Sequence, residues 1–444
     1  MTIMTVKPNY GALHCWEDYS ADLMTEYNQC IEEGLSIAHF EEVIKAAAKL
    51  PRCEFRVNLG EAIYKMVSEA KMMEGYKYNE PSDLEGIRAL RKAHPLSGKV
   101  NPDTIANKIH GAWMGRIAGC YLGKPVEGMR TPELWPLLKN SGNYPMTRYI
   151  KSSDCEEGYR KNLIAQYEQN KFMPTDDDTN YVVLAQVVVE RFGRDFTSDD
   201  MMRSWLWYQP KDAYCTAERR AFINFVAGFT PPASATYMNP YREWIGAQIR
   251  GDYFGYINPG NPEMAAEMAW RDARISHIKN GIYGEMFASA MIAAAAVTDN
   301  TRDIILAGLG EVPETSRLYE DVMSVISMYD EGKTWEDVTT YIHAKWNEHT
   351  AHGWCHTISN AMICAMALLY GDGDFGKSIC LAVQTGFDTD CNGATVGSVV
   401  GMIKGIDAID EVWQAPFDDT LETTIFGLTK VKISECAEKT MKHM

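Results

Sequence analysis

The chain has 444 residues, 46% hydrophobic and 11% aromatic, which suits one large domain with an addition, or two domains. Its net charge of −17 argues against nucleic acid as a partner, because phosphate binding needs basic stripes and none is found. Scattered cysteines without a C-x-x-C pair, no basic-then-apolar leader and no apolar run of about 18 residues indicate a cytoplasmic protein with no membrane partner.

Residues 14–92 have the amphipathic spacing of helices. The segment HPLSGKVNPD at 94–103 interrupts this spacing with prolines and a glycine, which indicates a linker. We therefore expect an N-terminal helical extension over residues 1–100 and a larger domain over residues 101–444. Ala-rich stretches such as 284–297 lack the β-branched alternation of strands, so the sequence predicts an all-α protein.

Glycines recur every four residues between His110 and Gly123, at Gly111, Gly115 and Gly119. On a helix they would form one glycine-lined face. Each glycine costs a helix roughly 1 kcal/mol relative to alanine, so the face predicts the close approach of another helix. A loop with several turns is the alternative, but the regular spacing favours the helix.

Three consecutive aspartates, Asp176, Asp177 and Asp178, stand between Thr175 and Thr179. Apolar residues at helical spacing follow directly, which places the acids at a helix N-terminus, where the helix dipole stabilises negative charge. N-capping alone is the simpler interpretation, since Asp and Thr are preferred there. One cap residue is sufficient, however, and adjacent carboxylates repel each other. The run therefore favours a bound cation.

A second acidic group, Asp388-x-Asp390-x-Asn392-Gly393, precedes another helix rich in small residues. It reproduces the opening of a calcium-binding EF-hand loop. That loop needs a bidentate glutamate at its twelfth position, which here is Val399 inside an apolar segment, so the EF-hand interpretation fails. The two aspartates still suit Mg²⁺ or Mn²⁺, and a polar turn that caps the next helix is the alternative. Together with the first run, they could form one binuclear centre that activates water.

These features together resemble the ADP-ribosylglycohydrolase family over about residues 105–435. The segment GCYLGKPVEG is similar to the family's opening motif, and its last acid, Glu127, corresponds to a residue beside the metal ions. The resemblance implies an all-α orthogonal multi-helix bundle. It also implies a centre of two divalent cations, Mg²⁺ or Mn²⁺.

The acidic run is similar to the family's T-D-D-T motif. Asp177, Asp178 and Thr179 align with D-D-T, and Asp176 then replaces a ligating threonine. A register one residue earlier, beginning at Thr175, is the alternative.

The segment DGDFGKSICLAVQTGFDTDCNGATVG resembles the family's C-terminal motif, so Asp388 and Asp390 are expected metal ligands. Cys391 stands where the family has Thr or Ser, and a soft thiol is a poor ligand for a hard cation. The resemblance therefore implies a set of metal ligands comprising Asp176, Asp177, Asp178, Asp388 and Asp390, and catalytic roles for Glu127, Asp177 and Asp390.

Two shorter segments resemble ligand contacts of the family. Gly246 to Gly251 is similar to a small-residue motif that includes Arg250, and Ser276-His277 with Asn280 is similar to a T-H motif near the ribose. The resemblance predicts substrate contacts for Gly246, Arg250, His277 and Asn280. A lone histidine is more often a structural core residue, so a purely structural role is the alternative.

The expected function is hydrolysis of an N-glycosidic bond to ribose in an ADP-ribosylated protein or an ADP-ribosyl small molecule. A smaller substrate, such as a nucleoside or another N-riboside, is the first alternative. A non-catalytic ADP-ribose-binding or scaffold protein is the second, and the retained acids disfavour it. The oligomeric state stays open.

Overall fold

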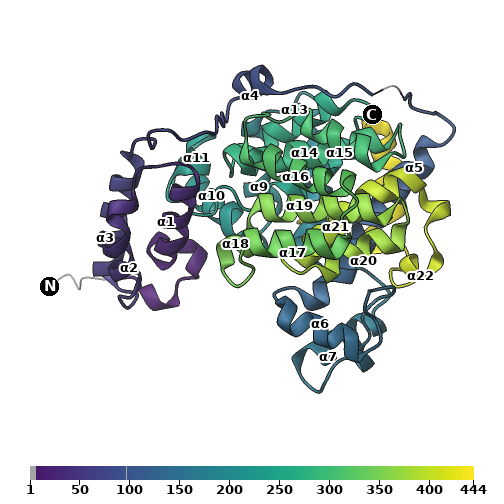
Figure 1. Ribbon diagram of the computed structural model, residues 1–444, viewed down its shortest axis with the longest axis horizontal. Helices are drawn as coiled ribbons and strands as arrows, with labels where there is room; N and C mark the ends of the chain where they lie inside the picture. The colour runs from purple at the N-terminus through teal and green to yellow at the C-terminus, as the bar shows by residue number, and fades with distance from the viewer. Residues whose placement is uncertain (1–6, 97) are drawn as a thin grey trace.

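The computed structural model describes residues 7–96 and 98–444. Residues 1–6 and Ser97, which belong to the expected extension and linker, lie outside the described residues. The fold is all-α, as predicted (Figure 1). Within the described ranges, the strands form one short antiparallel pair, β1 (Thr420–Glu422) and β2 (Lys430–Lys432). None of the described helices has the length and apolarity that crossing a membrane requires.

The α-helices fall into an N-terminal group and a larger set after residue 100. The N-terminal group is α1 (Leu23–Glu32), α2 (Glu41–Ala48), α3 (Glu54–Ser68) and α4 (Leu84–Leu90). The larger set begins with α5 (Ile105–Gly123), α6 (Thr131–Asn140), α7 (Tyr159–Gln169), α8 (Asp177–Phe192), α9 (Ser198–Tyr208), α10 (Thr216–Val226), α11 (Ala233–Thr236), α12 (Asp252–Tyr256) and α13 (Pro262–Ala273). It continues with α14 (Lys279–Ala295), α15 (Thr301–Leu309), α16 (Arg317–Asp330), α17 (Trp335–Lys345), α18 (Ala351–Cys355), α19 (Thr357–Gly371), α20 (Phe375–Gln384), α21 (Thr389–Lys404), α22 (Glu411–Gln414) and α23 (Ile433–His443).

Short 3₁₀ turns connect or extend these helices. They are η1 (Tyr10–Ala12), η2 (Cys15–Glu17), η3 (Tyr19–Asp22), η4 (Ala38–Phe40), η5 (Lys124–Val126), η6 (Ser152–Asp154), η7 (Lys211–Ala213), η8 (Gln248–Arg250) and η9 (Ile406–Ala408).

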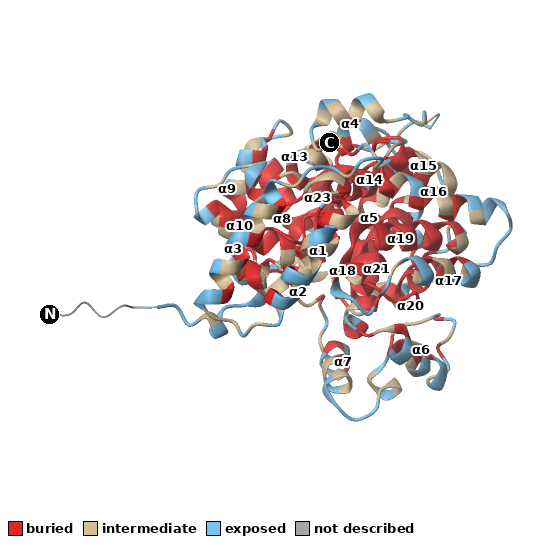
Figure 2. Ribbon diagram, turned by 60° about the vertical axis from the view of Figure 1, so that its left-hand side comes forward, coloured by how far each residue is buried: buried red, intermediate tan, exposed pale blue. Residues whose placement is uncertain are grey.

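The core lies around helices that are apolar on every side. In α14 every residue after Lys279 is buried, and in α19 every residue except Tyr370 is buried. Figure 2 shows these helices and α21 almost entirely in the buried colour, with other helices around them. A helix that is apolar all round has no face suited to water and is therefore enclosed by others. This explains why the Ala-rich segments of the sequence lack an amphipathic pattern.

Helices α5 and α21 pack backbone against backbone along matching glycines. A Cβ atom on Gly115 would lie 2.0 Å from the carbonyl oxygen of Gly397, and one on Gly119 would lie 1.9 Å from that of Gly393. Only glycine permits such an approach. The predicted close contact of the glycine-lined helix is thus confirmed, and its partner is the helix that starts at the second acidic group.

The N-terminal helices α1 to α3 surround a small core of their own, with Leu23, Ile44 and Ile63 among its buried residues. The chain then runs as an extended segment over the main body, where α4 lies beside α13 (Figure 1). Arg88 of α4 forms an ion pair of 2.7 Å with Glu267 of α13. The division into two domains at residue 100 stays a prediction.

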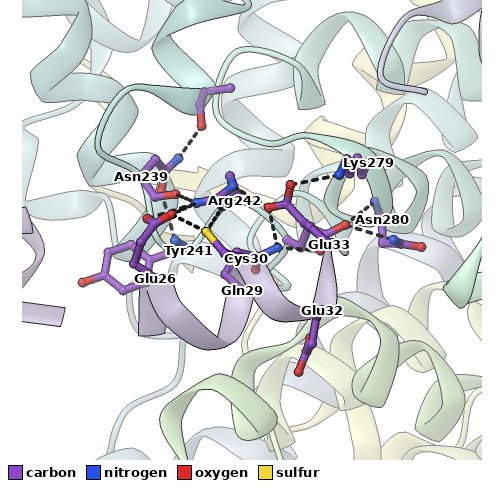
Figure 3. A network of polar contacts seen from close by, with 12 residues as sticks. Glu26, Gln29, Cys30, Glu32, Glu33, Asn239, Tyr241, Arg242, Lys279 and Asn280 are labelled. Carbon is purple, nitrogen blue, oxygen red and sulfur yellow. Dashed lines mark hydrogen bonds and ion pairs between the residues drawn. The ribbon is translucent and has the colours of Figure 1, made fainter. Parts of the chain in front are cut away.

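Buried charges join helix α1 to the main body (Figure 3). Arg242 donates hydrogen bonds to Glu26 at 2.9 Å and to Glu33 at 2.6 Å, and Lys279 lies 2.9 Å from Glu33. The pairing matters because an unpaired charge at such depth would be strongly destabilising.

Candidate active site

The candidate site lies where the C-terminal end of α5 meets the N-terminal ends of α8 and α21. Because α5 and α21 are packed along their glycines, the turn after Gly123 lies beside the start of α21. The hydroxyl of Thr389 donates a hydrogen bond of 2.9 Å to the carbonyl oxygen of Gly123. The backbone thus fixes Glu127 and the acids around Asp388 in one region.

The two acidic groups of the sequence meet in space. Ligand atoms of Glu127, Asp388 and Asp390 lie within 4.8 Å of one another, and the same holds for Asp178, Asp390 and Cys391. Asp390 belongs to both sets, so it connects the start of α21 with the start of α8. The convergence expected from the sequence is therefore present in the fold.

Asp176 is the N-cap of α8. Its Oδ1 accepts a hydrogen bond of 2.9 Å from the backbone N–H of Asp178, and its Oδ2 forms a short ion pair with Lys124. Burial alone would raise the pKa of Asp176, but the ammonium of Lys124 lowers it below the ordinary value. Asp176 therefore performs the capping role that was the simpler interpretation of the acidic run, and both its oxygens are engaged.

Asp178 is fully buried and held by Arg116 of α5. The guanidinium donates to Oδ1 of Asp178 at 2.7 Å and to Asp252 of α12 at 3.0 Å. The second oxygen of Asp178, Oδ2, has no hydrogen-bond partner among the described residues, and neither has Oδ1 of Asp390. A buried carboxylate oxygen without a donor is costly, so both atoms are placed to accept a cation.

The electrostatics of the site point the same way. Burial, with the neighbouring charges of Asp176 and Asp390, raises the pKa of Asp177 to about 7. Burial and the charge of Asp390 raise the pKa of Asp388 well above its ordinary value, and Asp390 likewise raises that of Glu127. The site thus contains more negative charge than Lys124 and Arg116 offset. The carboxylates outnumber the basic side chains that could neutralise them. Hard divalent ions prefer such carboxylate oxygens as ligands.

The turn before α21 has an unusual backbone. Gly386 has a φ of +86° and Phe387 a φ of +58°, a left-handed conformation that costs a bulky residue energy. The turn is held from outside, since Trp354 donates a short hydrogen bond to the carbonyl oxygen of Phe387 and Asn360 accepts one of 3.2 Å from the N–H of Asp388. These contacts fix the direction in which Asp388 leaves the chain.

A cavity of about 760 Å³ opens beside Lys124 and Glu127. Its lining comes from the segment between Lys124 and Tyr167, including α6, α7 and the turn that carries Glu127. Glu127 itself is exposed. The volume is in the range of small-molecule sites, and Glu127 is the residue that joins this cavity to the acids around Asp388 and Asp390.

Arg250 and Gly246, two predicted substrate contacts, lie in a buried ion group of their own. Arg250 donates to Asp272 at 2.8 Å and to Glu218 at 2.7 Å. A Cβ on Gly246 would lie 2.0 Å from a carboxylate oxygen of Glu218, so the glycine makes room for this pair. The structure gives both residues intramolecular partners, and their contact with substrate stays a prediction.

His277 and Asn280 are also buried. The Nδ1 of His277 lies 2.8 Å from the hydroxyl of Ser276, and burial lowers the pKa of His277 well below its ordinary value. The amide of Asn280 donates to Glu80 at 2.8 Å and to Glu243 at 2.9 Å. The structure places neither side chain among the aspartates of α8 and α21, and the role of both residues near ribose stays a prediction.

Sequence reasoning gave no role to several residues that shape the site: Lys124, Arg116 and Asp252. Lys124 stands directly before the motif's Pro-Val-Glu. A lysine beside an acidic motif indicates an ion pair, and this signal was present in the sequence. Arg116 is the one charged residue inside the glycine-spaced segment, which was a second signal. Asp252 carried no such signal.

Glu32 of α1 lies near two buried histidines of the main body. The Nε2 atoms of His352 and His356 lie 3.0 Å and 3.4 Å from its carboxylate. In both rings Nδ1 accepts a hydrogen bond, from Trp244 in His352 and from the backbone N–H of Ile358 in His356. Burial lowers the pKa of His356 well below its ordinary value, so this ring is neutral and carries its proton on Nε2. Glu32, His352 and His356 offer one ligand atom each within 4.8 Å of one another, and the Nε2 atoms of both rings lack a hydrogen-bond partner among the described residues.

Comparison with known proteins gives a family. Residues 101–440 match the model of the ADP-ribosylglycohydrolase family. No curated protein matches the chain significantly. Among solved structures, one described as an ADP-ribosylglycohydrolase-related protein complex is similar at 16% identity with a TM-score of 0.44, covering 77% of this chain and 99% of its own. The family match spans most of the sequence, and the chain therefore belongs to the ADP-ribosylglycohydrolase family.

Proposed function

We propose that the protein hydrolyses an N-glycosidic bond to ribose in an ADP-ribosyl compound, with two divalent cations, Mg²⁺ or Mn²⁺, at the site around Asp178 and Asp390. The observation that carries the proposal is the meeting of both acidic groups around two buried carboxylate oxygens that lack a donor. Family membership supports the reaction class.

The residues available to hold the cations are Asp177, Asp178, Asp388 and Asp390. Asp176 is the least available, because Lys124 and the α8 backbone already engage its oxygens. When bound, the cations would supply positive charge that fixes ribose hydroxyls and offsets a diphosphate in an otherwise acidic site.

The protein's own carboxylates perform the remaining steps. Glu127, at the exposed side near Asp388 and Asp390, orients the attacking water and accepts its proton. Asp177 and Asp390 face the anomeric carbon, where positive charge develops as the glycosidic bond breaks, and they stabilise it electrostatically. The water oxygen forms the new bond to that carbon, and the leaving group departs with the electron pair of the broken bond.

The cavity favours a leaving group that is not an anion. Five acidic side chains line it, among them Glu133, Glu156 and Glu157, against two basic ones, Arg160 and the Lys124 that already pairs with Asp176. A cationic guanidinium is therefore better accommodated there than a phosphate. We expect ADP-ribosyl-arginine to be cleaved faster than ADP-ribosyl-serine.

The test is to incubate the protein with Mg²⁺ or Mn²⁺ and a panel of ADP-ribosyl-arginine, ADP-ribosyl-serine and free nucleosides, and to measure released ribose products. Asp388→Ala should abolish turnover with little change in helical circular dichroism. Glu127→Gln should lower kcat by about 100-fold or more. The matched control is Asp195→Ala, an exposed aspartate after α8, which should retain wild-type turnover.

Two results would contradict the proposal. The first is wild-type turnover in both Asp388→Ala and Asp177→Ala, which would remove the metal centre from the reaction. The second is release of product from nucleosides alone, which would favour the smaller-substrate alternative.

A further inference from the structure

Two thiols lie among the acids of the candidate site. Cys391, in the first turn of α21, has its sulfur within 4.8 Å of ligand atoms of Asp178 and Asp390. Cys120 of α5 stands in the same relation to Asp176 and Asp178. Both cysteines are buried. A thiol at this place matters because sulfur and oxygen donors differ in the cations they select.

The free carboxylate oxygens distinguish the two thiols. Asp390 retains its unpartnered Oδ1 and Asp178 its Oδ2, and both residues belong to the set that includes Cys391. On the side of Cys120, by contrast, Asp176 has both oxygens committed to Lys124 and to its own helix. A cation held by the carboxylates of Asp178 and Asp390 would therefore lie within reach of the sulfur of Cys391.

The geometry points to a mixed oxygen–sulfur site in which Cys391, Asp178 and Asp390 bind one of the two divalent cations, so that a thiophilic ion can replace Mg²⁺ or Mn²⁺ at this one position. This inference rests on the proposed metal centre and specifies one of its ligands. It predicts that Zn²⁺, Co²⁺ or Cd²⁺ binds through sulfur, because a thiolate is a soft donor that suits such ions and is a poor ligand for Mg²⁺.

Binding through sulfur changes the proton balance of the site. The thiol of Cys391 loses its proton to solvent as its sulfur donates an electron pair to the cation, since a coordinating thiol is deprotonated. One proton is thus released from Cys391 for each thiophilic ion bound. A serine in its place would offer a hydroxyl, which remains a suitable donor for Mg²⁺.

Co²⁺ is the direct probe, because a cobalt–thiolate bond gives a sulfur-to-metal charge-transfer absorption in the near ultraviolet. Metal-free wild-type protein titrated with Co²⁺ should develop this band in step with binding measured by equilibrium dialysis. In Cys391→Ser the band should disappear and the Co²⁺ affinity should fall by about tenfold or more, while Mg²⁺ affinity is retained. Cys391→Thr should behave in the same way.

Cys380→Ser is the matched control, a buried free cysteine of α20 outside the acid groups, and it should keep the band. Co²⁺ binding without the band, or a band that survives in both Cys391 variants, would overturn the role of Cys391 and leave the metal centre intact. Loss of the band in Cys120→Ser with retention in Cys391→Ser would assign the sulfur ligand to Cys120 and overturn the inference. If no divalent ion binds the wild type, the proposed metal centre fails and this inference fails with it.

Discussion

At the scale of single residues, Arg116 shows how the protein itself supplies positive charge to the buried acids of the site. It is fully buried, it bonds Asp178 and Asp252, and it also donates to the backbone oxygens of Asp178 and Ile249. The fork of a guanidinium suits such a junction, because it can hold several acceptors at fixed angles. Arg116 thereby joins α5, α8 and α12 beneath the candidate metal ligands.

We expect Arg116→Met to lower the free energy of unfolding by about 3–5 kcal/mol, because it leaves Asp178 and Asp252 buried without their shared cation. Arg116→Lys should have a smaller effect, since it keeps the charge and loses the fork. Urea unfolding of metal-free protein at neutral pH measures both. A Met variant as stable as the wild type would show that the two carboxylates do not depend on this contact.

The acidic runs stand out in the sequence, whereas the partners that their supporting residues contact do not. Short acidic runs directly before helices include Asp177, Asp178, Asp388 and Asp390. Such a run is a local pattern that indicates a helix N-terminus without knowledge of the fold. Arg116 is 136 residues from Asp252 along the chain, and nothing local connects the two. Pairing across such a distance is decided by the fold, which periodicity alone does not give.

At the scale of elements, the packing of α5 against α21 determines where the acids are. The glycine period of α5 predicted a close partner but not which helix it would be. Gly393, Gly397 and Gly401 repeat the same four-residue spacing, and each would clash with a glycine carbonyl of α5 if it carried a Cβ. The two matching periods were therefore a signal for the pairing that sequence reasoning did not use.

We expect Gly119→Ala to lower the free energy of unfolding by about 1–3 kcal/mol or more, because its Cβ would lie 1.9 Å from the carbonyl oxygen of Gly393. The helices must separate to admit it, which shifts the start of α21 and should weaken Mn²⁺ binding as well. Thermal unfolding and equilibrium dialysis measure the two effects.

The control for this variant is Gly11→Ala, where the nearest atom to an added Cβ lies 3.6 Å away. It should change neither stability nor Mn²⁺ binding. If Gly119→Ala unfolds at the wild-type temperature, the backbone contact between the two helices is not as close as described.

At the scale of the whole molecule, buried charge decides how the N-terminal helices dock. Glu243 of the main body accepts hydrogen bonds from Gln29 of α1 at 2.6 Å, from Asn280 of α14 at 2.9 Å and from Arg317 of α16 at 2.7 Å. The all-α class followed from the sequence, but this docking did not. The glutamates of α1 have the spacing of an ordinary solvated helix face. Only the tertiary structure shows that basic side chains of the main body pair with them in the interior.

The pKa of Glu243 makes the stability of this buried network depend on pH. Burial alone would raise it, but Arg317 and Lys279 lower it from 4.5 to about 2. Between these values the unfolded chain binds more protons than the folded chain, so stability falls as the pH falls through this window and is fully present above it. A shift of this size corresponds to about 3 kcal/mol.

We therefore expect Glu243→Gln to be about 3 kcal/mol less stable than the wild type at pH 7, because Arg317 loses its buried counter-charge. The difference should shrink as the pH falls below about 4.5, since the wild-type carboxylate is then increasingly protonated as well. Urea unfolding at a series of pH values measures it, with the exposed Glu74→Gln as a control that should show no such convergence. A difference that stays constant from pH 7 to pH 3 would mean that the charge of Glu243 does not contribute to the stability of the folded chain.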